Sequence, residues 1–376
     1  MSISKGIRFI SYFFIVVLVG VILNVSCSKK EKKIIKVGLL LPLSGEASTY
    51  GKEYLQGIQM AKKDFEKTNL IKVKLYTEDT QGYSKIGMLA FQKLVNVNKV
   101  KFFIGPAFST VALTIAPFAV KNNILILSPG VSSRKFVKMG KTLFSIYPSA
   151  RSEGLALSEY CNKKEIKKIG ILFSENPAIE TIVNVFTKNY KGKILIKEQY
   201  KSGKKDFRNL IAKLKAYHLK NVLIAGYRDE VGMFAKQASN LGYKINILSI
   251  STLLDKKFIK DYGKFVKNIV FTAPYLSQEE FKTKFKKFYN EYVSIYHTAP
   301  TLWAALGYDA TNLVLLAIKN NKYQKDPLKV SKILLTKITP YRGITGKIKF
   351  DKYGGRIGGV RLWTIKNGKF VPLKEF

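Results

Sequence analysis

Small and hydroxyl-bearing residues gather in three short segments of the chain, each directly after an apolar stretch. The segments are residues 42–50 (PLSGEASTY), 105–110 (GPAFST) and 128–133 (SPGVSS). Ser109, Thr110 and Ser132 offer hydrogen-bond donors, and Gly130 allows close approach to the backbone. Such donors suit a carboxylate or an amide better than a phosphate. If the apolar stretches are strands of one sheet, the segments converge at its carboxyl edge, where such sheets bind ligands.

A second interpretation of Ser109 and Thr110 is purely structural. A helix is expected over residues 111–120, and serine and threonine are favoured helix N-caps. The alternative is a bound anion, because a helix start offers free N–H groups and a partial positive charge. The residue types alone leave both interpretations open.

Motifs for catalysis and for cofactors are missing from the sequence. No GxxxxGK[ST] occurs, no GxGxxG follows a strand, and there is no GxSxG elbow. Of the two histidines, His218 precedes an expected strand and His297 ends an expected helix, and neither lies beside a nucleophile. No Cys/His cluster has metal-ligand spacing. We therefore expect a protein that is not an enzyme and that has no cofactor or metal.

The apolar pattern predicts an alternation of strands and helices that runs twice. The first run has strands at 34–41, 71–76, 102–104 and 124–127 and helices at 54–65, 85–95 and 111–120. After a join near residues 147–149, the second has strands at 168–173, 193–200, 222–225 and 245–250 and helices at 179–189, 207–214 and 231–241. This order indicates an α/β fold with largely parallel sheets. A chain of 376 residues is too long for one compact core, so we expect two lobes.

Beyond residue 278 the pattern changes to two long helices and then short strands. Five aromatic residues at spacings of three and four predict one helix face in the core: Phe281, Phe285, Phe288, Tyr292 and Tyr296. A second helix is expected over 302–319. Residues 346–371 are predicted to form strands separated by glycine turns.

The first 33 residues have the pattern of an export signal. Lys5 and Arg8 precede an apolar run over residues 10–23, which at about 14 residues is short for a membrane span. The segment ends at Cys27 and resembles a bacterial lipobox, in which Cys27 is lipidated and residues 1–26 are removed. Asn24 departs from the leucine usual at that position, so an ordinary signal peptide or an uncleaved anchor stays open.

The formal net charge is +40, a value that often indicates a nucleic-acid partner. Here the lysines are spread along the whole chain, and no motif for reading RNA or DNA is present. We therefore expect no nucleic-acid partner, and we expect nonspecific attraction to anionic lipid headgroups.

Five segments, in order, resemble the periplasmic branched-chain amino acid-binding proteins, which are type I solute-binding proteins of ABC importers. They begin VGLLLPLSGEASTYG, IGPAFSTVAL, GYRDEVGMF, TLWAALGYDA and YRGITGKIKF, and the resemblance runs from about residue 34 to the end. It implies two Rossmann-like lobes joined by three crossovers. One lobe would comprise 34–148 with 277–338, and the other 149–276 with 339–376. Hinge closure would hold ligand between them.

The resemblance also implies a ligand site. It places an aromatic residue over the ligand at Tyr50, the carboxylate-binding hydroxyl at Ser109, and the second loop's contacts at Gly130 and Ser132. Tyr227 would be an aromatic of the second lobe, although Tyr50 and Tyr227 could also be simple core residues.

The second-lobe half of the implied site departs from the family pattern in two places. Ala178 stands where the family commonly has tyrosine. Ser251 stands where it often has the acid that binds the ligand's ammonium, and Asp255 lies four residues further on. Since a buried ammonium without a carboxylate is costly, the ligand could be an amine-free acid or an amide.

The sequence thus predicts a binding protein in the cell envelope, lipid-anchored and facing the periplasm or the extracellular side. Its partners would be a small amino acid or related carboxylate, an ABC permease and, through the lipid, the membrane. A sensor of amides or amino acids on the same fold is the alternative, and nothing in the sequence separates the two.

Overall fold

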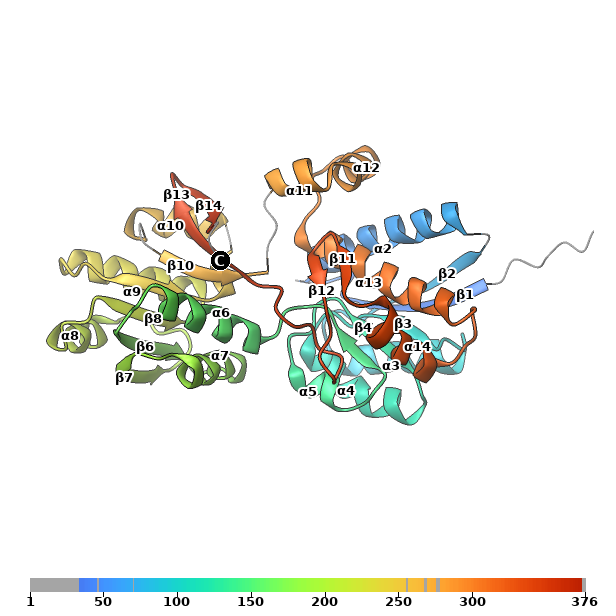
Figure 1. Ribbon diagram of the computed structural model, residues 1–376, viewed down its shortest axis with the longest axis horizontal. Coiled ribbons are helices and arrows are strands. Elements are labelled where there is room, and N and C mark those ends of the chain that lie inside the picture. Colours follow the sequence, from blue (N-terminus) through green and yellow to red (C-terminus); the bar gives the residue numbers. More distant parts are fainter. Residues whose placement is uncertain are drawn as a thin grey trace, which may run out of the picture.

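The computed structural model describes residues 34–45, 47–69, 71–254, 256–266, 269–274 and 278–373. Two bodies lie side by side, each with its own sheet and helices (Figure 1). The predicted signal segment and Cys27 lie outside the described residues. In the described part of the chain, no helix is both long and apolar enough to cross a membrane.

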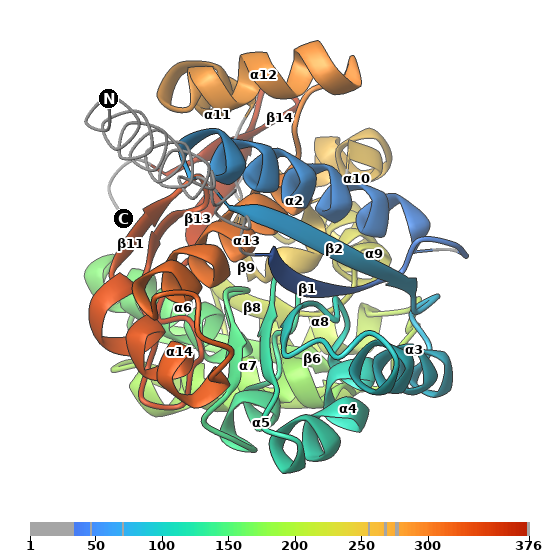
Figure 2. The same ribbon diagram turned by 90° about the vertical axis from the view of Figure 1, so that its right-hand side faces the viewer.

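The first body is built on a five-stranded parallel sheet in the order β2-β1-β3-β4-β5. Its strands are β1 (Ile34–Leu41), β2 (Lys72–Asp79), β3 (Phe102–Ile104), β4 (Leu125–Ser128) and β5 (Leu143–Ser145). Strand side chains alternate between two cores. Leu39 packs with α2 (Ser48–Thr68) and α13 (Leu302–Asn320), whereas Leu40 packs with α3 (Ser84–Asn96) and α4 (Ser109–Lys121). The sheet is therefore covered on both faces (Figure 2).

The second body has a seven-stranded sheet in the order β14-β13-β10-β9-β8-β6-β7. Five of its strands are parallel: β6 (Lys168–Ser174), β7 (Lys193–Tyr200), β8 (Asn221–Ala225), β9 (Asn246–Ser249) and β10 (Ile269–Ala273). β13 (Arg361–Lys366) pairs antiparallel with β10, and β14 (Lys369–Pro372) pairs antiparallel with β13. Its helices are α6 (Ala150–Lys163), α7 (Pro177–Asn189), α8 (Arg208–Ala216), α9 (Arg228–Asn240) and α10 (Lys256–Tyr262), with 3₁₀ turns at Ser251–Leu253 and Gly263–Phe265.

The expected elements of both runs are present, with ends shifted by a few residues. Strands β5 and β10 and the short helices α5 (Arg134–Lys138) and α10 are among the elements that were not predicted. The aromatic stripe lies on two helices, not one: α11 (Gln278–Lys284) and α12 (Lys286–Tyr296), which meet at Phe285. The prediction that the stripe is core is confirmed for Phe281, Phe288 and Tyr292, which are buried.

The chain returns to the second body later than residue 339. After α14 (Pro327–Ile333) and a π-helical turn (Leu334–Ile338), the hairpin β11 (Tyr341–Gly343) and β12 (Gly346–Ile348) follows. Ile348 and Phe350 are buried in the first body's core, and β13 is the next element of the second sheet. The packing therefore changes between residues 350 and 361, and not at the expected boundary.

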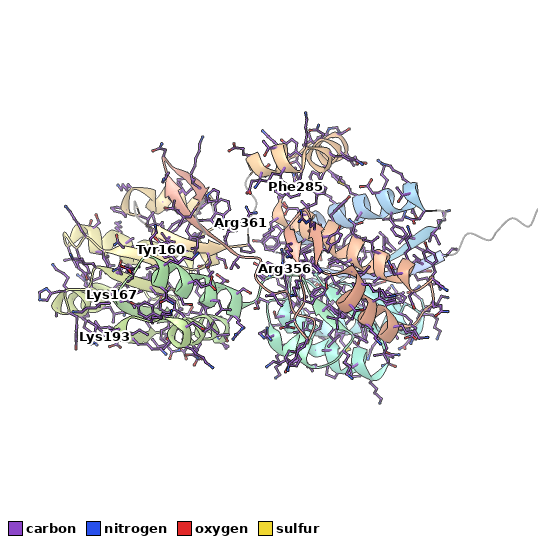
Figure 3. All side chains as sticks on the ribbon, viewed as in Figure 1. Tyr160, Lys167, Lys193, Phe285, Arg356 and Arg361 are labelled. Atoms are coloured by element: carbon purple, nitrogen blue, oxygen red, sulfur yellow. The ribbon has the colours of Figure 1, made fainter. Side chains whose placement is uncertain are left out.

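Arg356 lies in this last connection, between residues 350 and 361, and anchors it where the two bodies meet (Figure 3). Its guanidinium is buried and donates hydrogen bonds to the carbonyl oxygens of Ile146, Thr345 and Lys347 at 3.2, 2.7 and 3.2 Å. Ile146 leads into the first connection between the bodies, which runs between β5 and α6 (residues 146–149). One side chain thus ties two of the connecting segments together.

Candidate ligand-binding site

The loops after β3 and β4 meet at the carboxyl edge of the first sheet, as expected from their position after parallel strands. The buried hydroxyl of Ser128 donates to the Pro106 carbonyl at 2.7 Å. It also accepts from the N–H groups of Gly130 and Val131 at 3.2 and 2.9 Å. These bonds hold the Gly130 loop beside the loop that leads to Ser109.

Helix α4 begins at Ser109, but serine does not cap it. The N-cap residue is Phe108, and no side chain caps this end. Within the described part of the chain, the Ser109 hydroxyl makes no hydrogen bond, and Thr110 is exposed. The capping interpretation is therefore wrong for Ser109, and its hydroxyl is available to a ligand.

Asp79 orders the loop after β1. Its carboxylate accepts from Leu43 N at 2.8 Å, from Ser44 Oγ at 2.5 Å and from Gln81 N at 2.8 Å. Burial opposes the charged form, but these hydrogen bonds outweigh it and leave the pKa of Asp79 below its ordinary value. The loop that leads into α2 and Tyr50 is thereby fixed.

Aromatic rings line the same edge of the first body. Tyr50 meets Trp303, the second residue of α13, edge to face at 5.2 Å between ring centroids. Tyr147, in the first connection, stacks on Trp303 at 6.1 Å and 7°. Tyr50 is 45% exposed, so the core-only interpretation of this tyrosine is wrong. Trp303 and Tyr147 are half-buried.

In the second body, Tyr227 stands at the start of α9, directly after β8. It is 42% exposed, so it is not a core residue either. Its hydroxyl accepts from Asn176 Nδ2 at 3.0 Å, and Asn176 caps α7 through Ala178 N at 2.8 Å. Ala178 is exposed in the first turn of α7. The loops after β6 and β8 thus meet at one edge.

A carboxylate does stand beside Ser251, but it comes from α6. Ser251 N and Oγ donate to Glu153 at 2.9 and 3.0 Å, and Thr272 Oγ1 donates to it at 2.6 Å. Burial raises the pKa of Glu153, although these hydrogen bonds act in the opposite direction. Asp255, the acid expected nearby, lies outside the described residues. No group of acidic, histidine or cysteine side chains in the described ranges could hold a metal ion.

A family model described as periplasmic binding protein matches residues 34–369. The chain belongs to this family. The two-sheet α/β architecture of the type I class, predicted from the resemblance, is confirmed, and the family implies a location outside the cytoplasm.

Known periplasmic binding proteins are similar along most of the chain. The Leu/Ile/Val-binding protein BraC3 of Rhizobium johnstonii is 26% identical over 60% of this chain and 63% of its own length. The Leu/Ile/Val-binding protein homolog 2 of Brucella abortus is 25% identical over 85% of this chain and 87% of its own. These relatives are binding proteins and not enzymes, which is the class predicted for this chain.

Solved structures share the fold. The branched-chain amino acid transporter substrate-binding protein LivJ of Streptococcus pneumoniae, in complex with isoleucine, has a TM-score of 0.72 and 24% identity, covering 91% of this chain and 100% of its own. The leucine-binding protein LivK of Thermotoga maritima has a TM-score of 0.72 and 25% identity, covering 90% and 97%. A solute-binding protein of R. palustris in complex with benzoate has a TM-score of 0.70 and 19% identity, covering 90% and 95%.

Sequence reasoning about this periplasmic binding protein missed three side chains at these edges: Tyr147, Glu153 and Trp303. Trp303 could have been predicted as a site residue, because it is one of only two tryptophans and lies at the start of an expected helix. Tyr147 lies in the first connection between the bodies, and Glu153 lies in α6, the helix that follows it. Their position depends on how the chain crosses between the two sheets, which no local pattern reveals.

Proposed function

We propose that the chain is a solute-binding protein of an ABC importer that takes up a small carboxylate, such as an amino acid or a relative of one. The free hydroxyl of Ser109 carries this proposal. It stands at a helix start whose first N–H groups have no side-chain cap, and the glycine loop at Gly130 lies alongside. Hydroxyl and N–H donors with a helix dipole suit a carboxylate.

Aromatic rings at the two sheet edges support the same function. Tyr50 is exposed and meets the half-buried ring of Trp303 at the edge of the first body, and Tyr227 is exposed at the edge of the second sheet. Few polar groups amid apolar walls are typical of small-molecule sites. We propose that the solute lies between the two bodies, touching both, and that the chain then delivers it to a permease.

A thermal-shift screen tests the proposal. The panel contains branched-chain, polar and aromatic amino acids, short amides, and amine-free acids that include benzoate. A true ligand at about 100 times its Kd stabilises the chain by roughly 2.7 kcal/mol, which raises the melting temperature measurably. If the ligand bridges both bodies, small-angle scattering will show a smaller radius of gyration in its presence. A panel without any shift would contradict the proposed solute class.

We further propose that the chain is held at the membrane by a lipid on Cys27. The support is the sequence pattern of residues 5–28, which is typical of exported lipoproteins, together with a family that works outside the cytoplasm.

A further inference from the structure

Glu153 is a charged side chain surrounded by neutral partners. It lies in the first turn of α6 and faces the ends of β9 and β10. Its Oε2 accepts from Ser251 N and Thr272 Oγ1, and its Oε1 accepts from Ser251 Oγ. In the described part of the chain, no lysine, arginine or histidine forms an ion pair with it. The carboxylate is fixed in place, but its charge is not neutralised.

This lack of a cation is unexpected in so basic a protein. Lysine and arginine number 65, against 25 acidic residues. Other acids form ion pairs, both the exposed Asp206, with Arg208 at 2.6 Å, and the half-buried Glu66, with Lys62 at 2.8 Å. Burial without a cation disfavours an ionised carboxylate, so the site has a cost that an added cation would offset.

Glu230 shows what a purely structural carboxylate looks like in the same body. It is 3% exposed and accepts four hydrogen bonds, two on each oxygen, from Ser174, Tyr200, Gly203 and Tyr227. A carboxylate has about four acceptor positions, so Glu230 is saturated. Glu153 has three donors and is half-buried. It retains one acceptor position and access from solvent.

An aromatic residue of the proposed solute site precedes Glu153 in the chain. Tyr147 lies six residues before Glu153, in the connection that leads into α6, and the charge of Glu153 adds to burial in raising the pKa of this tyrosine. The Tyr147 ring stacks on Trp303, which in turn contacts Tyr50. Aromatic faces attract cations, and most strongly where water is excluded. A cation that binds Glu153 is therefore expected near the rings of the proposed solute site.

We propose that Glu153 binds the protonated amine of the solute, so that the ligand is an amino acid and not an amine-free acid. The inference rests on the proposed function, in which the carboxylate of the same solute binds at Ser109. A primary ammonium has three N–H donors, and one of them would fill the open position on Glu153. Ser251 and Thr272 are positioning residues, because they donate hydrogen bonds to the Glu153 carboxylate and act on the ligand only through it.

The test is calorimetric titration with a matched pair of ligands. The pair is leucine and 4-methylpentanoate, which is leucine without its amine, or the corresponding pair for whichever amino acid stabilises the chain most. Wild-type protein should bind the amino acid more tightly than its amine-free counterpart. Glu153→Gln keeps the size of the side chain but removes its charge. It should weaken amino acid binding about 10- to 100-fold, the range for hydrogen bonds to charged groups, and leave the amine-free acid unaffected.

Glu159→Gln is the matched control, because Glu159 is an exposed glutamate on the same helix. It should change neither affinity. Equal amino acid binding by wild type and Glu153→Gln would overturn the role of Glu153 while the binding function stood. Tighter binding of the amine-free acid than of the amino acid by wild type would also overturn the role of Glu153. This comparison uses the wild-type protein alone, so it holds even if Glu153→Gln does not fold. If neither kind of acid binds, the proposed function fails and the inference fails with it.

Discussion

At the residue scale, serine side chains at the two sheet edges have different roles. Ser128 is buried and uses its hydroxyl three times, to join two loops. The Ser251 hydroxyl donates its hydrogen bond to Glu153. Ser109 has no such partner in the described part of the chain, although it stands where α4 offers its free N–H groups. Only a hydroxyl without an internal partner can give its hydrogen bond to a solute at no structural loss.

Replacing Ser109 with alanine should therefore weaken solute binding and leave folding nearly unchanged. The expected loss is about 1–3 kcal/mol of binding free energy, from one charge-assisted hydrogen bond that is no longer made. Titration calorimetry measures the affinity, and a thermal melt measures the stability. Ser84→Ala is the control, because Ser84 is also the first residue of an uncapped helix in the same body. If Ser109→Ala binds as tightly as wild type, Ser109 is not part of the site.

At the element scale, local periodicity predicted most strands and helices but not how they join. Residues 34–41 and 193–200 were predicted with the observed ends because both are bounded by turn-forming or polar residues. The break between α11 and α12 at Phe285 has no proline or glycine to announce it, so the aromatic stripe was predicted as one helix. The first-body half of the candidate site was predictable because its residues directly follow strands. Glu153 and Trp303 were not, because helices distant in sequence bring them there.

The pairing of α2 and α13 is the element-scale contact on which the aromatic part of the site depends. Gly57 of α2 lies so close to α13 that a Cβ atom would be 1.9 Å from the Ala304 carbonyl oxygen. Gly307 of α13 approaches α2 in the same way, since its Cβ would lie 2.4 Å from the Tyr54 carbonyl oxygen. Tyr50 and Trp303, at the starts of the two helices, meet because the helices pack this closely.

Gly57→Ala should force the two helices apart. We expect a loss of about 1–3 kcal/mol or more in the free energy of unfolding, which is the usual cost of overpacking. Solute affinity should fall as well, because Tyr50 and Trp303 would shift relative to each other. Thermal melts and calorimetry measure the two effects. Gly263→Ala is the control, because a Cβ there would meet only Ile259 Cγ2, at 3.4 Å. Similar melts for both variants would contradict this account of the helix pair.

At the scale of the whole molecule, the net positive charge can hold the chain at a membrane without a lipid anchor. The excess of 40 positive charges attracts the chain to anionic lipid, and each lysine or arginine near such a surface contributes about 1 kcal/mol. Sedimentation with membranes at low salt is therefore expected with or without a lipid. The two causes separate at high ionic strength. In about 1 M salt the Debye length falls to about 3 Å, and the attraction of surface charges is largely screened.

The two cysteines of the chain allow a clean test of lipidation at Cys27. Expressed with radiolabelled fatty acid in a bacterial host, the wild-type chain should take up label and stay with membranes washed in 1 M salt, on the order of the concentration that screens surface charge. Cys27→Ala should lose the label and be released by the wash. Cys161→Ala should behave as wild type, because Cys161 is buried and its burial raises the pKa of the thiol to about 12. If Cys27→Ala stays in the washed membranes and wild type carries no label, residues 1–33 act as an uncleaved anchor. If both chains are released without label, the segment is an ordinary signal peptide.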